Sequence, residues 1–241
     1  MTPYLAEFIG TAVLLYLGCG VNANVSLKAT YGNGSGWIVI SFGWAMAVFV
    51  AVFIAADASG AHLNPAVTLA LAVAKNFPWA EVPGYVLAQI GGAFFGAVLA
   101  YVQYRPHYAT EPEPGTILGT FATGPAIPDT LANVLSEVVA TFVFVLAVLF
   151  LAGPSFGEQE VGLGSLDALP VALVVLAIGL SVGGTTGYAI NPARDLGPRI
   201  AHAVLPIRGK GGSNWSYAWI PFFGPLLGAA LSAGAFILLA A

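Results

Sequence analysis

The chain has 241 residues, of which 58% are hydrophobic and 7% are charged, and its mean hydropathy is +0.87. Soluble globular domains carry about 25% charged residues, so this composition argues against a water-soluble domain and predicts a membrane protein. The net charge of −4 comes without a basic patch, which argues against a nucleic-acid partner, and the single cysteine, Cys19, excludes an internal disulfide or a multi-cysteine metal site.

Six apolar stretches are long enough to cross a bilayer, which takes about 20 mostly apolar residues in a helix. We place them at residues 4–25, 36–56, 83–103, 132–153, 168–184 and 215–240. The first stretch is not interpreted as a secretory signal, because no Lys or Arg precedes it and Glu7 lies within it.

Two further apolar segments are too short to span a membrane. One begins at Asn64 and runs to about Lys75, and the other begins at Asn191 and runs to about Val204. Both begin with the same tripeptide, in which the asparagine can cap a helix and the proline fits its first position. The two boxes are Asn64-Pro65-Ala66 and Asn191-Pro192-Ala193.

The sequence repeats itself at an offset of 127 to 132 residues. Glu7 and Glu137 open the first and fourth spans, the two boxes correspond, and the glycine pair at 92 and 96 is echoed at 224 and 228. Each half holds three spans, so the second half must be inserted upside down. We therefore predict one channel domain over 1–241, built of inverted repeats at about 1–110 and 131–241 and joined by a loop at 104–131, with its site near the membrane midplane.

Two short helices that enter from opposite faces would bring their N-termini together near the centre of the bilayer. Each N-terminus carries roughly half a positive charge and unpaired N–H groups, so the meeting point repels cations, including hydronium. Asn64 and Asn191 would offer amide donors to a passing oxygen atom and interrupt a proton wire. This arrangement predicts a pore for neutral, hydrogen-bonding molecules.

Paired Asn-Pro-Ala boxes in an inverted six-span repeat, the second followed by Arg194, resemble the aquaporin (major intrinsic protein) superfamily. Asp195 and Arg199 resemble its glycerol-facilitator branch, although the two also lie at i and i+4 and can simply form a stabilising pair. The resemblance implies an all-α membrane protein with six transmembrane helices and two re-entrant half-helices.

The resemblance also implies a selectivity filter made of Trp44, Gly179, Tyr188 and Arg194. Two aromatic faces would take the C–H edge of a polyol, and the arginine would take its hydroxyl edge. Gly179 would leave width that a histidine fills in water-selective members. Trp44 or Tyr188 alone would be explained by packing, whereas a charge at membrane depth, such as Arg194, is a functional hypothesis by default.

Backbone that lines a wet cavity is expected before each box, because non-helical backbone at membrane depth is tolerated only there. The residues concerned are Gly60, Ala61, His62, Gly187 and Ala189. His62 is either a pore-lining group or a packed, hydrogen-bonded histidine. Glu7 and Glu137 are interpreted as structural anchors for the two loops, with a proton relay as the alternative.

These features predict a passive channel for glycerol, similar small uncharged polyols and water, with no enzymatic activity, cofactor or metal ion. A channel mainly for water, urea or ammonia is the alternative within the family. A coupled secondary transporter would need ionisable groups in its pathway. No recognisable catalytic set is found in the sequence, which argues against a membrane enzyme. A structural junction protein would not need Arg194.

The resemblance further implies a homotetramer in the lipid of the plasma membrane, with both termini cytoplasmic. The positive-inside rule points the other way. In that orientation Lys75 lies in a cytoplasmic loop, whereas Lys28, Arg105, Arg208 and Lys210 lie outside. We give precedence to the family, because so few charges decide the count.

Overall fold

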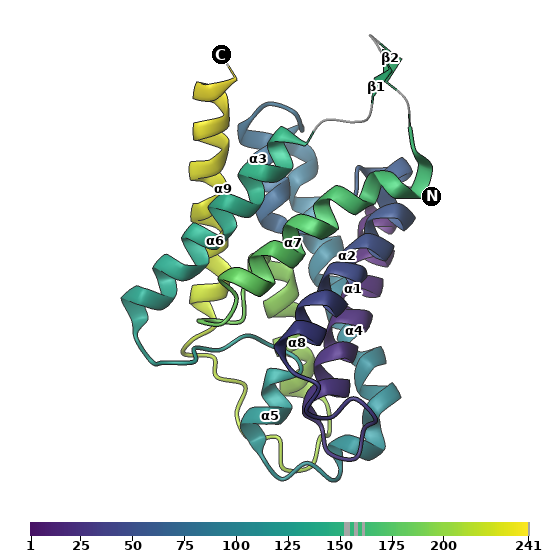
Figure 1. The fold of residues 1–241 in the computed structure, drawn as a ribbon, viewed down its shortest axis with the longest axis vertical. Helices are drawn as coiled ribbons and strands as arrows, with labels where there is room; N and C mark the ends of the chain where they lie inside the picture. Colours follow the sequence, from purple (N-terminus) through teal and green to yellow (C-terminus); the bar gives the residue numbers. More distant parts are fainter. Residues whose placement is uncertain (152–154, 157–158, 161, 241) are drawn as a thin grey trace.

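Six long helices run through the molecule, and each is apolar enough to cross a membrane (Figure 1). The computed structural model describes residues 1–151, 155–156, 159–160 and 162–240. The crossing helices are α1 (Pro3–Ser26), α2 (Trp37–Ser59), α4 (Val82–Tyr108), α6 (Thr130–Phe150), α7 (Leu169–Ser181) and α9 (Trp219–Leu239). The 3-10 turns η1 (Trp79–Glu81) and η2 (Gly164–Ala168) lead into α4 and α7.

Two shorter helices, α3 (Pro65–Val73) and α8 (Pro192–Val204), begin inside the bundle and contact each other. Each packs against the third span of the opposite half: α3 against α9, and α8 against α4. The two halves are therefore interlocked rather than merely adjacent. The predicted fold class, an all-α membrane protein with six spans and two half-helices, is confirmed.

Small residues let the first and third spans of each half approach closely. A Cβ on Gly96 would lie 2.2 Å from the Ala12 carbonyl oxygen of α1, and a Cβ on Gly228 would lie 2.4 Å from the Val138 carbonyl oxygen of α6. Without side chains at these positions the backbones of α1 and α4, and of α6 and α9, can touch. The echoed glycines thus occupy equivalent helix crossings.

The segment expected as a loop at 104–131 is partly helical. The helix α4 continues past Pro106 to Tyr108. Pro106 removes one backbone donor, but the next turn still forms, since Ala109 N donates to Arg105 O at 3.3 Å. A further helix, α5 (Pro114–Gly119), begins with proline at its first position, which favours helix initiation.

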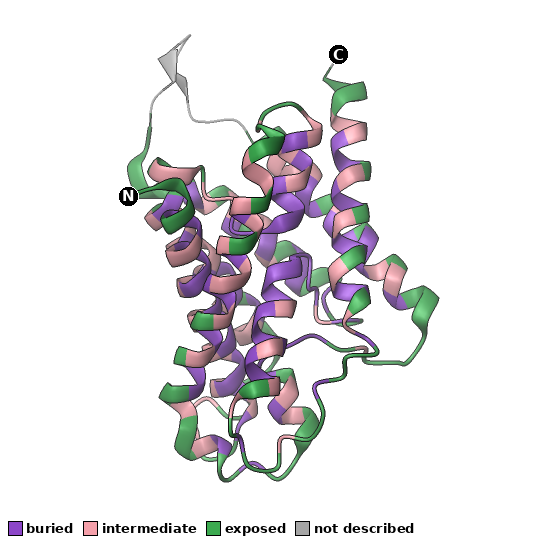
Figure 2. Cartoon of the chain, turned by 180° about the vertical axis from the view of Figure 1, so that it is seen from behind, coloured by how far each residue is buried: buried purple, intermediate pink, exposed green. Residues whose placement is uncertain are grey.

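Between α6 and α7 the two-residue strands β1 (Ser155–Phe156) and β2 (Gln159–Glu160) pair antiparallel. Buried residues line the inward faces of the helices, and exposed ones lie on the outer faces and at the ends (Figure 2). Many of these outer residues are large and apolar, which suits contact with lipid or with other subunits. Examples are Phe42, Leu87, Phe95, Leu135, Phe223 and Leu227.

Candidate functional site: two cavities that meet at a constriction

Each Asn-Pro-Ala box forms the start of a half-helix. Asn64 Oδ1 accepts a hydrogen bond from Ala66 N at 2.8 Å, and Asn191 Oδ1 accepts one from Ala193 N at 3.0 Å. The proline after each asparagine occupies the first helical position, where a backbone N–H would have no intrahelical acceptor. The two helix N-termini therefore face each other with their caps in place.

The capping asparagines also join the two halves. Asn64 Nδ2 donates to Ile190 O at 2.8 Å, and Asn191 Nδ2 donates to Leu63 O at 2.9 Å. An amide group carries two hydrogens, so each asparagine keeps one for the cavity that both residues line. The sequence predicted only the donors offered to a solute, and these two bonds between the halves are an additional role of the asparagines.

Two cavities lie on either side of one narrow point. The inner cavity, of about 200 Å³, lies between α2, α6, α7 and the half-helices. The outer cavity, of about 430 Å³, opens among residues 116–126 and 183–188. Trp44, Tyr188 and Arg194 line both cavities and so mark the constriction between them. The predicted backbone residues line the inner cavity (Gly60, Ala61, His62 and Ala189) or the outer one (Gly187).

One wall of the constriction pairs an aromatic ring with a cation. The Arg194 Cζ atom lies 4.2 Å from the centroid of the Trp44 ring. Trp44 is itself fixed, because its Nε1 donates to Asn22 Oδ1 at 3.0 Å and its ring fills the space beside Gly18, where a Cβ would lie 2.4 Å away. A cation over an indole face is favourable, particularly where water is excluded.

The charge of Arg194 has no counter-ion in the part of the chain that the structure describes. The ion pair found there joins Asp195 and Arg199, and Arg194 Nη1 is buried without a hydrogen-bond partner. Arg194 lines both cavities, and a guanidinium without protein hydrogen bonds at their junction can donate from the N–H groups that face the cavities to a solute oxygen. Among the same residues no cluster of His, Cys, Asp and Glu could hold a metal ion.

The ring of Tyr188 also lines the constriction. Gly179 does not line either cavity. A Cβ on Gly179 would lie 3.1 Å from Tyr188 Cζ, so the ring occupies the room that the glycine leaves. The prediction that Gly179 leaves width in the pore is therefore not met, because the ring of Tyr188 fills that space. Gly179 therefore acts on the constriction from behind Tyr188.

The loops that precede the boxes share an unusual backbone. In both loops the residues four, three and one positions before the asparagine have positive φ, with 50° at Ala61 and Leu63, 39° at Tyr188 and 43° at Ile190. Such conformations cost non-glycine residues about 1–3 kcal/mol each and persist only where the surroundings hold them. Their recurrence at equivalent positions ties the strain to the cavity lining.

The two buried glutamates contact these strained loops. Glu7 accepts hydrogen bonds from the N–H groups of residues 62 and 63, at 2.9 and 2.7 Å. Glu137 accepts them from residues 189 and 190, both at 3.0 Å. In each case a neighbouring hydroxyl donates a further bond. These are the contacts that an anchor for the loops requires.

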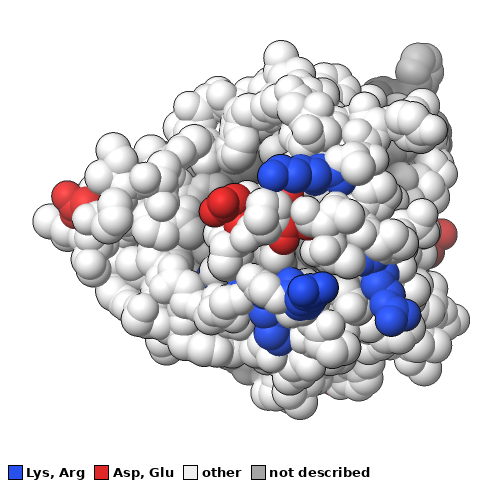
Figure 3. Space-filling model, turned by 90° about the horizontal axis from the view of Figure 1, so that it is seen from below, with Lys and Arg blue, Asp and Glu red and all other residues white. Residues whose placement is uncertain are grey.

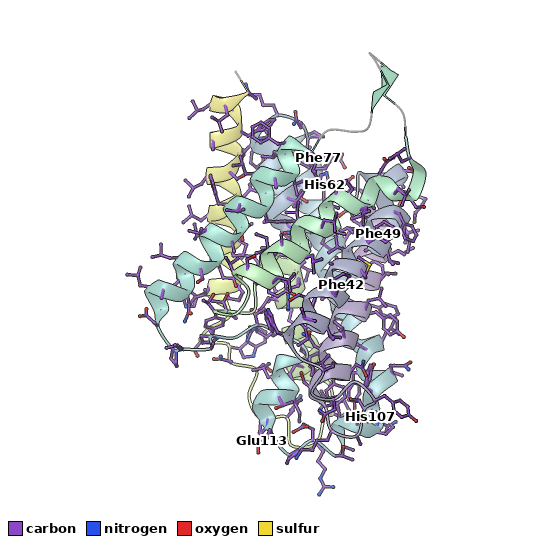
Figure 4. All side chains as sticks on the ribbon, viewed as in Figure 1. Phe42, Phe49, His62, Phe77, His107 and Glu113 are labelled. Carbon is purple, nitrogen blue, oxygen red and sulfur yellow. The ribbon has the colours of Figure 1, made fainter. Side chains whose placement is uncertain are left out.

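His62 combines the two roles that the sequence left open. It lines the inner cavity, its Nδ1 lies 3.1 Å from Thr68 Oγ1, and its ring packs against Phe77 and Tyr85 at centroid distances of 4.7 and 4.9 Å. Figure 4 shows His62 and Phe77 together at the end of the molecule opposite His107 and Glu113.

Asp195 and Arg199 bind more than each other. Their ion pair is 2.8 Å long, Asp195 accepts from the Thr123 N–H at 2.8 Å, and Arg199 donates to the carbonyls of Thr123 and Ser213. The pair therefore fastens two loops of the outer end to α8. That arrangement accounts for both residues without contact to a solute.

Trp37 and Ser41 were not singled out in the sequence. Trp37 lines the outer cavity, donates from Nε1 to Gly179 O at 2.8 Å and meets the Tyr188 ring edge to face at 5.8 Å. Ser41 lies one helical turn further along α2, beside Gly179. Their spacing from Trp44, seven and three residues, was the signal that could have placed them on the same helix face.

The fold and the site together define a class: a membrane channel of inverted repeats whose half-helices meet at an inner cavity that leads to a constriction. A family model described as "Major intrinsic protein" matches residues 1–237, and the chain belongs to that family. It is 54% identical over 228 residues to the "Glycerol uptake facilitator protein" of Bacillus subtilis (strain 168), covering 95% of this chain and 81% of the relative.

Two further relatives span nearly the full length. The "Glycerol uptake facilitator protein" of Streptococcus pneumoniae (strain ATCC BAA-255 / R6) is 52% identical over 232 residues, with 96% of this chain and 97% of the relative covered. Among solved structures, the aquaglyceroporin from Plasmodium falciparum matches with a TM-score of 0.82 and 29% identity, over 97% of this chain and 94% of that one.

Proposed function

We propose that this protein is a passive channel for glycerol and similar small uncharged polyols, that it also passes water, and that it excludes ions and protons. One observation carries the proposal: Trp44, Tyr188 and Arg194 line both cavities, so a solute that crosses meets two aromatic rings and a free guanidinium at one point. A polyol has a C–H edge and a hydroxyl edge that fit those two surfaces.

The names of the relatives support the choice of solute. Proteins that are 54% and 52% identical are called glycerol uptake facilitators, and the matching solved structure is an aquaglyceroporin. Trp44, Gly179, Tyr188 and Arg194 form the proposed filter. A channel mainly for water, urea or ammonia is the second candidate, and the two aromatic rings beside Arg194 argue against strict water selectivity.

The exclusion of ions and protons rests on the meeting of α3 and α8. Two helix N-termini and Arg194 place positive charge beside the inner cavity and the constriction, which repels cations. The amide hydrogens that Asn64 and Asn191 keep for the cavity would each hold a passing oxygen as an acceptor and so break a chain of water molecules.

An uncoupled channel is favoured over a transporter by the state of the two buried carboxylates. The oxygens of Glu7 and Glu137 accept several hydrogen bonds each from their loops, and neither residue lines the inner or the outer cavity. An ion-coupled mechanism that used these two carboxylates would need the solute pathway to reach them. We place the protein in the plasma membrane as a homotetramer, with both termini in the cytoplasm.

The proposal is tested by reconstitution in liposomes. Light scattering would follow reswelling in an inward glycerol gradient and shrinkage in a sucrose gradient, for the wild type and for Trp44→Phe/Gly179→His. The wild type should reswell rapidly, and the double variant should lose about tenfold or more in glycerol flux, or about 1.4 kcal/mol in barrier height, with water flow retained. Water flow without glycerol entry in the wild type would overturn the glycerol assignment.

A further inference from the structure

Tyr188 lines both cavities, but its hydroxyl is buried within the protein. This hydroxyl makes no hydrogen bond of standard geometry, and the same is true of the buried Ser41 hydroxyl. The two side chains are neighbours: the point where a Cβ of residue 179 would stand is 3.1 Å from both Ser41 Oγ and Tyr188 Cζ. Two unsatisfied hydroxyls thus face the same small space.

The rest of the Tyr188 ring is enclosed by α7 and α2. A Cβ on Gly183 would lie 2.4 Å from Tyr188 Cδ1. The Trp37 indole packs against the outer side of the ring, and its Nε1 donates a hydrogen bond to the Gly179 carbonyl. That carbonyl belongs to the last turn of α7, where helix carbonyls lack intrahelical donors. The ring therefore has one open side, which is the constriction.

We propose that Ser41 is a positioning residue for the constriction: its hydroxyl pairs with the Tyr188 hydroxyl and keeps the ring against α7. The proposal deepens the proposed function, on which it rests. A buried hydroxyl without a partner is costly. With Ser41 removed, the phenol can recover a partner by turning toward water in the cavities, which brings the ring into the path of the solute.

The pairing predicts a specific pattern of rescue. Ser41→Ala leaves the phenol without its partner, so the ring narrows the path. In Tyr188→Phe the ring has no hydroxyl that needs a partner, so it stays packed against α7. The ring should stay there equally well when Tyr188→Phe is combined with Ser41→Ala. A role of Ser41 in packing alone would leave the defect of Ser41→Ala unchanged in the double variant.

The experiment measures glycerol, erythritol and water permeability of the wild type, both single variants and the double variant in liposomes. We expect Ser41→Ala to lower the erythritol-to-water ratio about threefold to tenfold, in line with the loss of one hydrogen bond, and the double variant to return to the value of Tyr188→Phe. Ser232→Ala is the matched control, because Ser232, like Ser41, is buried without a hydrogen-bond partner, but it belongs to α9, which contributes no residue to either cavity. A normal ratio in Ser41→Ala, or no rescue, would overturn the pairing.

Thermal unfolding of the same four proteins in detergent separates this inference from the proposed function. A hydroxyl pair makes the two substitutions non-additive in their effect on the unfolding midpoint, whatever solute the protein passes. If the two substitutions are non-additive and the wild type passes no polyol, the hydroxyl pair is supported and the glycerol assignment is rejected. Additive midpoints would reject the pair, whatever the permeability.

Discussion

Glu7 and Glu137 are both fully buried, and both direct their oxygens at backbone N–H groups rather than at a cation. Each glutamate supplies acceptors to a loop that has left the helical hydrogen-bonding pattern inside the membrane. An unsatisfied backbone group in that environment is costly, so the carboxylates stabilise the conformation of the loops. Ala61 and Tyr188, which have positive φ angles, directly precede residues 62 and 189, whose N–H groups donate to these carboxylates.

Removing one of these carboxylates should destabilise the whole protein. In Glu137→Ala the N–H groups of residues 189 and 190 lose their acceptor, at about 1–3 kcal/mol each, so the free energy of unfolding should fall by about 2–6 kcal/mol. The measurement is thermal and chemical unfolding in detergent. The exposed Glu113→Ala provides the control and should change stability by less than about 0.5 kcal/mol. Equal stabilities of the two variants would show that Glu137 is no anchor.

At the scale of whole helices, the molecule depends on close crossings between the first and third spans of each half. Gly96 of α4 and Gly228 of α9 bring backbones into contact at equivalent places. Lipid provides no hydrophobic driving force for helix association, so tight packing at such crossings carries much of the stability.

Adding a side chain at one of these helix crossings should therefore lower the stability of the protein. A methyl group in Gly96→Ala would lie 2.2 Å from the Ala12 carbonyl oxygen and force α1 and α4 apart, at a cost of about 1–3 kcal/mol. Gly20→Ala is the matched control within α1, because a Cβ there meets nothing within 4 Å. Unfolding midpoints in detergent would compare the two. If Gly96→Ala were as stable as Gly20→Ala, the crossing would not be tight.

The helices themselves could be predicted from the sequence, because span length, the Asn-Pro-Ala caps and the echoed motifs are local signals. The packing behind the constriction could not. Whether the space beside Gly179 belongs to the pore or to Tyr188 depends on how α2, α7 and a loop pack together. The spacing of residues within a single segment does not determine that packing. The same holds for the lock between Asn64 and Ile190, which are 126 residues apart. The last residues of α4 lie in the segment that was predicted as a loop at 104–131, because the helix continues through Pro106 to Tyr108.

At the scale of the whole molecule, basic charge is unevenly distributed. Exposed Lys28, Arg105 and Arg208 lie in or beside the loops of the outer end, which Figure 3 views directly, whereas Lys75 follows α3 at the other end. The positive-inside rule alone would turn the outer end toward the cytoplasm. The family resemblance implies the opposite orientation.

Single-cysteine labelling in intact cells decides between the orientations. Cys19 is fully buried, so it should add little background. We expect a membrane-impermeant maleimide to label Gly212→Cys, in the outer loop, without permeabilisation. Asn76→Cys, in the loop after α3, should react only once the membrane is opened. Both positions are exposed. The reverse pattern would invert the proposed orientation and leave the pore argument intact.

The central claim is an open, uncoupled path for glycerol, and the most direct measurement is the time course of labelled glycerol entering proteoliposomes with and without an imposed proton or sodium gradient. We predict rapid entry that stops when the inner and outer concentrations are equal, with the same rate and final level in every gradient. Accumulation above the outer concentration, driven by either ion, would contradict a passive channel. Entry no faster than in protein-free liposomes would contradict the glycerol path itself.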